Sequence, residues 1–249
     1  MSDSDRSPLL KLRPRDHPVI ASGIPLLDEY LVGGFRKDSL LHFYGEPGAG
    51  KTTFAMQIMA HTMHEGWKGI WVDSNTAFSL EKFARIVGDE AVLRTLILVQ
   101  PKSFTHQTQI LQNMKYYLDR VGIIVVDSIT HYYRVERFQE ASQGFFQELI
   151  DTQLGALVGI AHMQQIPIIL TNYATLEEGG KKVPLVGRGF QRVERYRFYF
   201  SNKSRDEDSI KYLTIEYAPE KYSQKRVFRF EINSAGITGF QLKKVEEDE

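Results

Sequence analysis

The sequence has no cysteine and no uninterrupted apolar run that is long enough to cross a membrane. The lack of cysteine excludes disulfide bonds and thiolate metal sites. Its 31 basic residues balance its 31 acidic residues, so the net charge does not indicate a partner such as nucleic acid. Residues 1–6 are polar and acidic, unlike a secretory signal. We therefore expect a soluble cytoplasmic protein without a membrane partner.

The length and composition are those of one large folded domain. The chain has 249 residues, of which 42% are hydrophobic, and this is enough to form a full core. Residues 1–18 contain three prolines among charged side chains, so we expect a flexible N-terminal segment. Residues 243–249 end in four acidic residues and predict a disordered tail. The folded domain is therefore expected to span residues 19–242.

Strand-like and helix-like stretches alternate through the first two thirds of the chain. Short apolar runs predict strands over residues 40–44, 69–73, 96–99, 123–127 and 167–171. Helix-forming or amphipathic stretches predict helices over residues 52–64, 80–87, 104–120 and 139–164. The alternation is typical of βαβ units, so we predict an α/β fold with a mostly parallel central sheet and helices on both faces.

The pattern changes after residue 175. Residues 175–190 hold four glycines and predict a mobile loop. Strand-like runs follow at residues 193–200, 210–217 and 227–232, with no helix-like stretch between them. We expect these three runs to be antiparallel C-terminal strands added at the edge of the sheet.

Residues 45–52, Gly-Glu-Pro-Gly-Ala-Gly-Lys-Thr, fit the phosphate-binding P-loop pattern G-x-x-x-x-G-K-[ST]. They lie between a predicted strand and a predicted helix, which is the context that the pattern requires. The glycines let backbone N–H groups face a phosphate, and the helix adds its positive N-terminus. Lys51 is expected to reach the β- and γ-phosphates, and Thr52 to hold Mg²⁺. The predicted ATP-binding residues are Gly45, Glu46, Pro47, Gly48, Ala49, Gly50, Lys51, Thr52 and Thr53.

Asp127 ends the most hydrophobic of the predicted strands. A carboxylate at the carboxyl end of such a strand, beside a P-loop, is expected to help hold the Mg²⁺ that accompanies ATP. Thr52 and Asp127 are therefore the predicted magnesium residues. The alternative is a strand-end aspartate that only caps a turn.

Several short motifs occur in the same order as in RecA-type recombinases. They are residues 22–28 (SGIPLLD), 43–52 (FYGEPGAGKT), 73–78 (DSNTAF), 126–130 (VDSIT), 133–136 (YRVE), 171–173 (TNY) and 227–237. From about residue 20 to residue 240 the chain resembles the RecA-type recombinase family, and within it the archaeal RadA- and RadB-like paralogues that lack the N-terminal domain. The resemblance implies a RecA-like P-loop ATPase core and a function in homologous recombination and DNA repair.

Two positions depart from the family pattern. Asn75 stands where the family has the glutamate that activates the attacking water, and an amide cannot accept a proton as a base. Tyr173 stands where the family has a glutamine that senses the γ-phosphate. The resemblance therefore implies ATP binding with weak or absent hydrolysis and no assigned catalytic residue. Two alternatives remain: Glu81 replaces the missing acid, or an alignment shift of one or two residues brings another acid there.

Full recombinases also carry an N-terminal helical domain and a linker with an F-x-x-A motif that joins one subunit to the next. Residues 1–18 contain neither. Of the family's DSP segment, which covers the ATP of the neighbouring subunit, only Pro219 is matched here. By resemblance we expect no long filament of this chain alone, and we expect docking onto a RadA-type recombinase or its filament.

Residues 181–205 carry eight cations against one acid, Glu194, a local charge of 8 − 1 = +7. In the family the corresponding loop contacts single-stranded DNA, where cations meet phosphates. Alternation within residues 195–200 assigns the aromatic side chains at 196, 198 and 200 to the core. The predicted DNA contacts are Lys181, Lys182, Arg188 and Arg192, with Arg134 as a further candidate. A solvated strand face is the alternative.

Together these features predict an ATP-binding recombinase paralogue that binds single-stranded DNA and modulates a RadA-type recombinase, in the cytoplasm at the nucleoid. One alternative is an active DNA-dependent ATPase with strand-pairing activity, which DNA-stimulated phosphate release would support. The other is a KaiC-like signalling or scaffold ATPase without a DNA role, which a failure to bind oligonucleotides at low salt would support.

Overall fold

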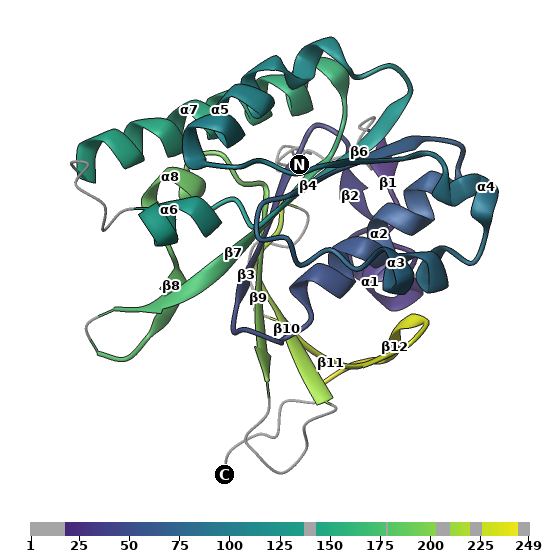
Figure 1. Ribbon diagram of the computed structural model, residues 1–249. Helices are drawn as coiled ribbons and strands as arrows, with labels where there is room; N and C mark the ends of the chain where they lie inside the picture. Colours follow the sequence, from purple (N-terminus) through teal and green to yellow (C-terminus); the bar gives the residue numbers. More distant parts are fainter. Residues whose placement is uncertain (1–17, 137–142, 178, 203–209, 220–225, 244–249) are drawn as a thin grey trace, which may run out of the picture.

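The computed structural model describes residues 18–136, 143–177, 179–202, 210–219 and 226–243. A ten-stranded sheet forms the centre of the molecule, with helices on both sides of it (Figure 1). The strand order is β12-β11-β10-β9-β3-β7-β6-β4-β5, and β8 pairs with β7 outside this order. The predicted α/β fold class is confirmed.

The parallel half of the sheet contains the five strands that the apolar runs predicted. They are β3 (Leu40–Gly45), β4 (Lys68–Asp73), β5 (Leu96–Val99), β6 (Val121–Asp127) and β7 (Ile168–Leu176). β3 pairs with β7, β7 with β6, β6 with β4 and β4 with β5, all in parallel. β3 is buried along its whole length, because both faces of the sheet are covered, and this explains its largely apolar sequence.

The C-terminal strands are β9 (Tyr196–Asn202), β10 (Ile210–Tyr217), β11 (Arg226–Asn233) and β12 (Gly236–Leu242). Antiparallel pairs join β9 to β10, β10 to β11 and β11 to β12, which confirms the predicted antiparallel addition. One correction concerns β9, which pairs in parallel with β3. The chain returns to the amino end of the sheet before β9 begins, so β9 extends the parallel half and the antiparallel half starts after it.

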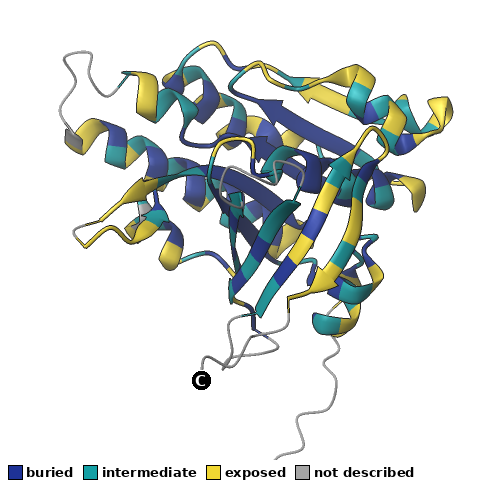
Figure 2. Ribbon diagram, turned by 90° about the horizontal axis from the view of Figure 1, so that it is seen from below, coloured by how far each residue is buried: buried dark blue, intermediate teal, exposed yellow. Residues whose placement is uncertain are grey.

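Two hydrophobic clusters lie on opposite faces of the sheet. One is formed with α1 (Pro25–Tyr30), α2 (Lys51–His64) and α3 (Leu80–Val87), and the other with α5 (Phe104–Asn113) and α7 (Gln143–Gln164). Figure 2 shows buried strands at the centre and exposed residues on the outer surfaces of the helices. Tyr196, Phe198 and Phe200 are fully buried in the first cluster, as their alternation predicted.

Two predicted helices differ from the structure in length. The helix predicted over residues 104–120 ends at Asn113 and is followed by a single 3₁₀ turn, η1 (Met114–Tyr116). Arg120 has a left-handed φ of 56°, which a right-handed helix does not accommodate. The helix predicted over residues 139–164 is α7, of which the structure describes Gln143–Gln164, and residues 139–142 lie outside the described residues.

The prediction of a mobile loop over residues 175–190 was wrong. β7 continues to Leu176 and pairs antiparallel with β8 (Lys182–Pro184), and α8 (Gly187–Gln191) follows. Gly179 and Gly180 have φ values of 91° and 78°, so these glycines provide the reversal of a hairpin. Figure 1 shows this β7–β8 hairpin extending away from the body of the sheet.

The remaining elements are short. β1 (Val19–Ile20) and β2 (Phe35–Arg36) form a separate antiparallel pair, and α4 (Glu90–Leu93) and α6 (His131–Glu136) are single turns or little more. Residues 1–17 of the predicted flexible segment and residues 244–249 of the predicted tail lie outside the described residues.

None of the helices in the described ranges is long and apolar enough to span a membrane.

We predict opposite effects on stability for two glycine-to-alanine substitutions. A Cβ at Gly45, where φ is 146°, would lie 2.0 Å from the carbonyl oxygen of Phe200 on β9, so Gly45→Ala should lower the free energy of unfolding. We expect a loss of about 1–3 kcal/mol from backbone strain alone. Gly159 lies within α7 in open space, so Gly159→Ala should raise the free energy of unfolding by about 0.5–1 kcal/mol. Urea titrations followed by circular dichroism measure both. Equal effects of the two changes would contradict the pairing of β3 with β9.

Candidate nucleotide-binding site

The P-loop connects the end of β3 to the start of α2, as predicted. Gly50 is the N-cap residue of α2 and has a left-handed φ of 95°, and no side chain caps the first turn of the helix. The N–H groups of that turn are therefore available at the loop, together with the positive end of the helix. Such a helix start is suited to bind an anion such as a phosphate group.

Lys51 is held by the loop itself. Its Nζ donates to the carbonyl oxygens of Gly45 at 3.0 Å and Glu46 at 2.7 Å. Burial lowers the pKa of the Lys51 amine from 10.5 to about 8, although the negative charges of Asp127 and Glu46 oppose this shift. These carbonyl groups carry only partial negative charge, whereas a phosphate group carries a full one. We therefore expect Lys51 Nζ to exchange the two carbonyl contacts for a phosphate oxygen when a nucleotide binds.

Asp127 joins three elements at the carboxyl end of β6. The Thr52 hydroxyl donates to Asp127 Oδ2 at 2.8 Å, and the Thr171 hydroxyl of β7 donates to Asp127 Oδ1. Burial raises the pKa of Asp127, while the hydrogen bonds from Thr171 and Thr52 oppose the rise. The structure thus places the two predicted magnesium residues, Thr52 and Asp127, in direct contact.

These residues fit ATP with Mg²⁺. The uncapped start of α2 and the buried amine of Lys51 suit a triphosphate, and the paired hydroxyl and carboxylate are oxygen ligands of the type that Mg²⁺ prefers. No group of three or more His, Cys, Asp or Glu side chains in the described ranges is arranged to hold a metal ion alone. Mg²⁺ is commonly held by one or two protein groups together with the phosphates of the substrate.

Asn75, at the position of the expected catalytic acid, follows β4. Its side-chain oxygen accepts the Ala77 N–H at 3.1 Å, so it stabilises the local turn. Glu81, the alternative acid, has a side chain that is 81% exposed and pairs with Arg85 on the surface of α3. The buried acid nearest in sequence is Asp73, whose two oxygens accept from the Ala77 N–H and the Gln100 amide.

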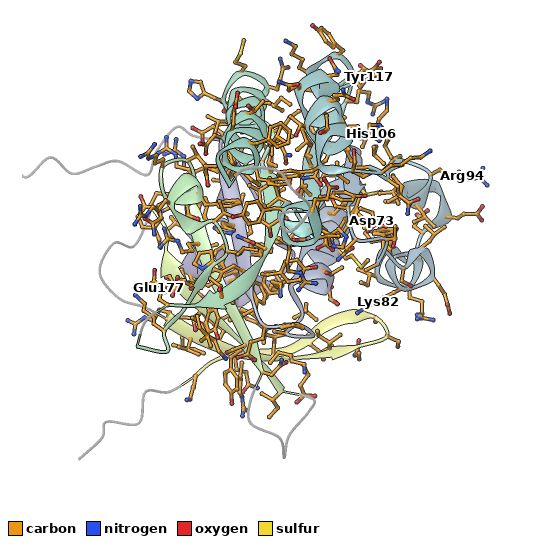
Figure 3. The ribbon with its side chains drawn as sticks, turned by 60° about the vertical axis from the view of Figure 1, so that its left-hand side comes forward. Asp73, Lys82, Arg94, His106, Tyr117 and Glu177 are labelled. Carbon is orange, nitrogen blue, oxygen red and sulfur yellow. The ribbon has the colours of Figure 1, made fainter. Side chains whose placement is uncertain are left out.

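Lys82 is a site residue that the sequence did not reveal. It lies on α3, and its Nζ donates to the Thr53 hydroxyl at 2.6 Å, so a second ammonium group lies beside the first turn of α2 (Figure 3). Burial lowers the pKa of Lys82, and the charge of Arg85 lowers it further. In the sequence Lys82 is one charged residue on an amphipathic helix, and only the packing of α3 against α2 brings it to the P-loop.

Tyr173, at the position of the expected sensor glutamine, lies directly beside the P-loop. In the parallel pair of β3 and β7 it is the partner of Gly45. Its ring lies under the guanidinium of Arg134 on α6, with 4.1 Å between the guanidinium carbon and the ring centroid. Its N–H donates to the side chain of Asn172 at 2.7 Å, which fixes the backbone at this position. The tyrosine thus contacts a predicted DNA cation instead of offering an amide to a phosphate.

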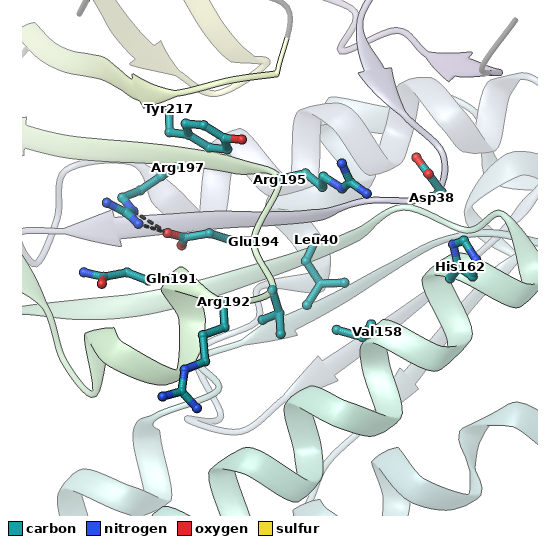
Figure 4. A pocket seen from close by; sticks show the side chains of 11 residues that line it. Asp38, Leu40, Val158, His162, Gln191, Arg192, Glu194, Arg195, Arg197 and Tyr217 are labelled. Carbon is teal, nitrogen blue, oxygen red and sulfur yellow. Dashed lines mark hydrogen bonds and ion pairs between the residues drawn. The ribbon is translucent and has the colours of Figure 1, made fainter. Parts of the chain in front are cut away.

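The five predicted DNA cations do not converge on one place. Lys181 and Lys182 lie on the β7–β8 hairpin at the carboxyl edge of the sheet, and Arg134 lines the same cavity as Lys182. Arg188 lies on α8, next to α7. Arg192 lines a different cavity of about 590 Å³ near Leu40, where β3 begins, which is the opposite end of that strand from the P-loop (Figure 4).

The site therefore defines a P-loop protein with the mononucleotide-binding fold of a parallel α/β sheet. The sequence model of the Rad51 family matches residues 15–236, so the chain belongs to the Rad51 family. Membership in a family of ATPase domains implies that the P-loop binds a nucleotide.

The chain is similar to archaeal proteins called RadB. It is 30% identical to the DNA repair and recombination protein RadB of Methanococcoides burtonii over 68% of this chain and 76% of that protein. It is 26% identical to the RadB of Methanococcus maripaludis strain C5 over 77% of this chain and 87% of that protein. The crystal structure of the RadB recombinase superposes with a TM-score of 0.72 at 26% identity, covering 88% of this chain and 98% of that one.

We predict that nucleotide binding takes up protons at alkaline pH. At pH 8.5 a Lys51 amine with a pKa of about 8 is mostly neutral, and a bound triphosphate raises that pKa, so binding should take up roughly 0.7 proton. The uptake should disappear below pH 7, where Lys51 is already charged. Calorimetry in two buffers of different ionisation enthalpy measures it.

Lys51→Arg provides the matched control, because a guanidinium keeps the charge and does not titrate in this range. Lys82→Arg provides the second control, because the pKa of Lys82 is also lowered by burial. An uptake that persists unchanged in Lys51→Arg would contradict the assignment to Lys51.

Proposed function

We propose that this chain is an ATP-binding Rad51-family accessory protein that binds single-stranded DNA and modulates a RadA-type recombinase in homologous recombination and DNA repair. Its ATP hydrolysis is weak or absent. It acts in the cytoplasm, at the nucleoid.

The observation that carries the proposal is the contrast within the nucleotide site. Every residue of the P-loop pattern is present in the sequence, and the hydrogen bond from Thr52 to Asp127 supports a magnesium site beside it. The group at the position of the catalytic acid is an amide, and it is engaged with the backbone of Ala77. A site that binds but lacks a general base loses about 10²–10⁴-fold in the rate of the chemical step.

The nucleic-acid part of the proposal rests on the carboxyl edge of the sheet. A cavity of about 310 Å³ opens there between the P-loop and the β7–β8 hairpin, and Arg134, Tyr173 and Lys182 line it. Cations beside an aromatic ring suit single-stranded nucleic acid, whose phosphates and bases they contact. The names of the relatives, DNA repair and recombination proteins, support the same context for this chain.

Asn75→Glu should raise ATP turnover. The wild-type protein should hydrolyse ATP very slowly with or without single-stranded DNA, and the new carboxylate should recover about 10²-fold or more because it supplies the missing base. Asn75→Gln, which has the same length without a basic oxygen, is the control. Steady-state phosphate release measures all three proteins. Fast turnover by the wild type would instead favour the DNA-dependent ATPase. Asp73, the buried acid nearest in sequence to Asn75, would then be the candidate for the general base.

The two groups of cations should differ in their effect on DNA binding. Lys181→Ala and Arg134→Ala should each weaken binding of a labelled oligonucleotide and reduce the slope of log K against log salt by about 0.7, the value for one single-strand phosphate contact. Arg192→Ala should leave both quantities nearly unchanged, because Arg192 lies at the other end of β3. Fluorescence anisotropy at several salt concentrations measures both. An absence of binding by the wild type at low salt would favour the scaffold ATPase without a DNA role.

A further inference from the structure

Glu46 of the P-loop connects the nucleotide site to the β7–β8 hairpin. Its backbone carbonyl accepts from Lys51 Nζ at 2.7 Å. Its side-chain carboxylate forms an ion pair with Lys182 of the hairpin and accepts the Asn202 N–H of β9 at 2.9 Å. One residue thus contacts the lysine that is poised for a phosphate and a cation that is predicted to bind DNA.

The two lysines of the hairpin differ in whether an acidic side chain pairs with them. Lys182 is paired with Glu46, while Lys181 has no acidic partner in the part of the chain that the structure describes. The Lys182 side chain is 45% exposed and that of Glu46 is 22% exposed, so the pair lies at the surface where a polyanion can reach it. A nucleic-acid phosphate that approaches the hairpin meets Lys181 directly but must replace the Glu46 carboxylate at Lys182.

Both groups of the pair are ionised at neutral pH. The hydrogen bond to Glu46 raises the pKa of Lys182. Burial alone would raise the pKa of Glu46, but the hydrogen bonds from Lys182 and Asn202 outweigh it and the pKa falls. The contact is therefore an ion pair throughout the physiological range, and it opposes any other anion at Lys182.

We infer that this pair, the Glu46–Lys182 latch, is an autoinhibitory contact in which the P-loop carboxylate competes with single-stranded DNA phosphates for Lys182. The inference rests on the proposed binding of single-stranded DNA. It assigns a role to the Glu46 side chain that is separate from the predicted contact of the P-loop backbone with phosphate, since the P-loop pattern accepts any side chain at this position.

The latch also makes ATP and DNA oppose each other. When DNA draws Lys182 away, the Glu46 carboxylate is left without its cation beside the site of the triphosphate. Its charge acts on Lys51, which would contact the phosphates. Repulsion between the uncompensated Glu46 carboxylate and the triphosphate lowers the affinity for ATP. By thermodynamic reciprocity, bound ATP lowers the affinity for DNA by the same factor.

Glu46→Gln should open the latch while keeping an oxygen for the Asn202 N–H. We expect the affinity for a labelled oligonucleotide at low salt to rise about two- to fivefold, the range for an exposed ion pair. The slope of log K against log salt should become steeper by about 0.7, because Lys182 gains one phosphate. Lys182→Ala should cost more affinity in the Glu46→Gln background than in the wild type. ATP added together with Mg²⁺ should lower the affinity of the wild type for the oligonucleotide, and it should lower that of Glu46→Gln by a smaller factor.

Glu177→Gln is the matched control. Glu177 lies on the same hairpin (Figure 3), and its side chain has no ion pair among the described residues, so its loss changes the local charge by the same amount without opening the latch. An equal gain in Glu177→Gln and Glu46→Gln would overturn the latch. Additive effects of Glu46→Gln and Lys182→Ala would overturn it as well.

A second measurement reads the latch without DNA. The rate of acetylation of Lys182 relative to Lys181, measured by mass spectrometry with a limiting amine-acylating reagent, should be low in the wild type and should rise in Glu46→Gln. An unchanged ratio would show that the latch does not form in solution, whatever the DNA result. If the ratio rises but neither protein binds oligonucleotides, the proposed DNA function fails and the contact remains.

Discussion

The carboxylate of Asp127 is the point on which the site depends. It ends β6, whose last five residues are all buried, and accepts from hydroxyls on two other elements, Thr52 at the start of α2 and Thr171 on β7. An ionised carboxylate at such a position is costly to bury, and the two hydroxyls together with the charge of Lys51 offset part of that cost. These two hydrogen bonds link the carboxyl end of β6 to β7 and to the start of α2.

Because parallel strands bring their carboxyl ends to one edge, residues far apart in the sequence meet beside Asp127. Gly45 and Tyr173 are partners in the register of β3 and β7, and Asp73 and Asp127 are partners in that of β4 and β6. The hairpin that continues β7 places its lysines at the same edge. A nucleotide and a nucleic acid would therefore bind within a few residues of each other, and any charged side chain between them, such as Glu46, acts on both.

The sequence was informative where a pattern is local and its chemistry specific. The P-loop pattern needs only eight consecutive residues, and the interpretation of Asp127 needed only its place at the end of an apolar strand. The structure places the loop between β3 and α2 and Asp127 at the end of β6, and the Thr52–Asp127 hydrogen bond adds a contact that the sequence did not predict. The β7–β8 hairpin was missed because its glycines look the same in a turn as in a loop, and the pairing of Leu176 with Lys182 is decided by the sheet. Lys82 was missed because its contact with Thr53 depends on how α3 packs.

The grouping of the predicted DNA cations shows the same limit. Lys182 and Arg192 are ten residues apart in the sequence, yet between them the chain passes from the carboxyl edge of the sheet to its amino edge. Local charge density therefore grouped cations that the fold separates. Sequence distance is a poor measure of spatial distance wherever a connection crosses the sheet.

The combination of a complete phosphate site with an amide at the position of the acid has a thermodynamic consequence. A ligand that binds the folded state and is not turned over stabilises that state for as long as it remains bound, and the gain grows with its concentration relative to its dissociation constant. Under the proposed function, ATP acts as a structural and regulatory ligand, and its hydrolysis is not the source of free energy. Elements that contact the P-loop, including α3 through Lys82 and the hairpin through Glu46, would share this stabilisation. Under this proposal, a site without a general base can keep the groups expected to hold the phosphates, because binding alone supplies the free energy that such a protein uses.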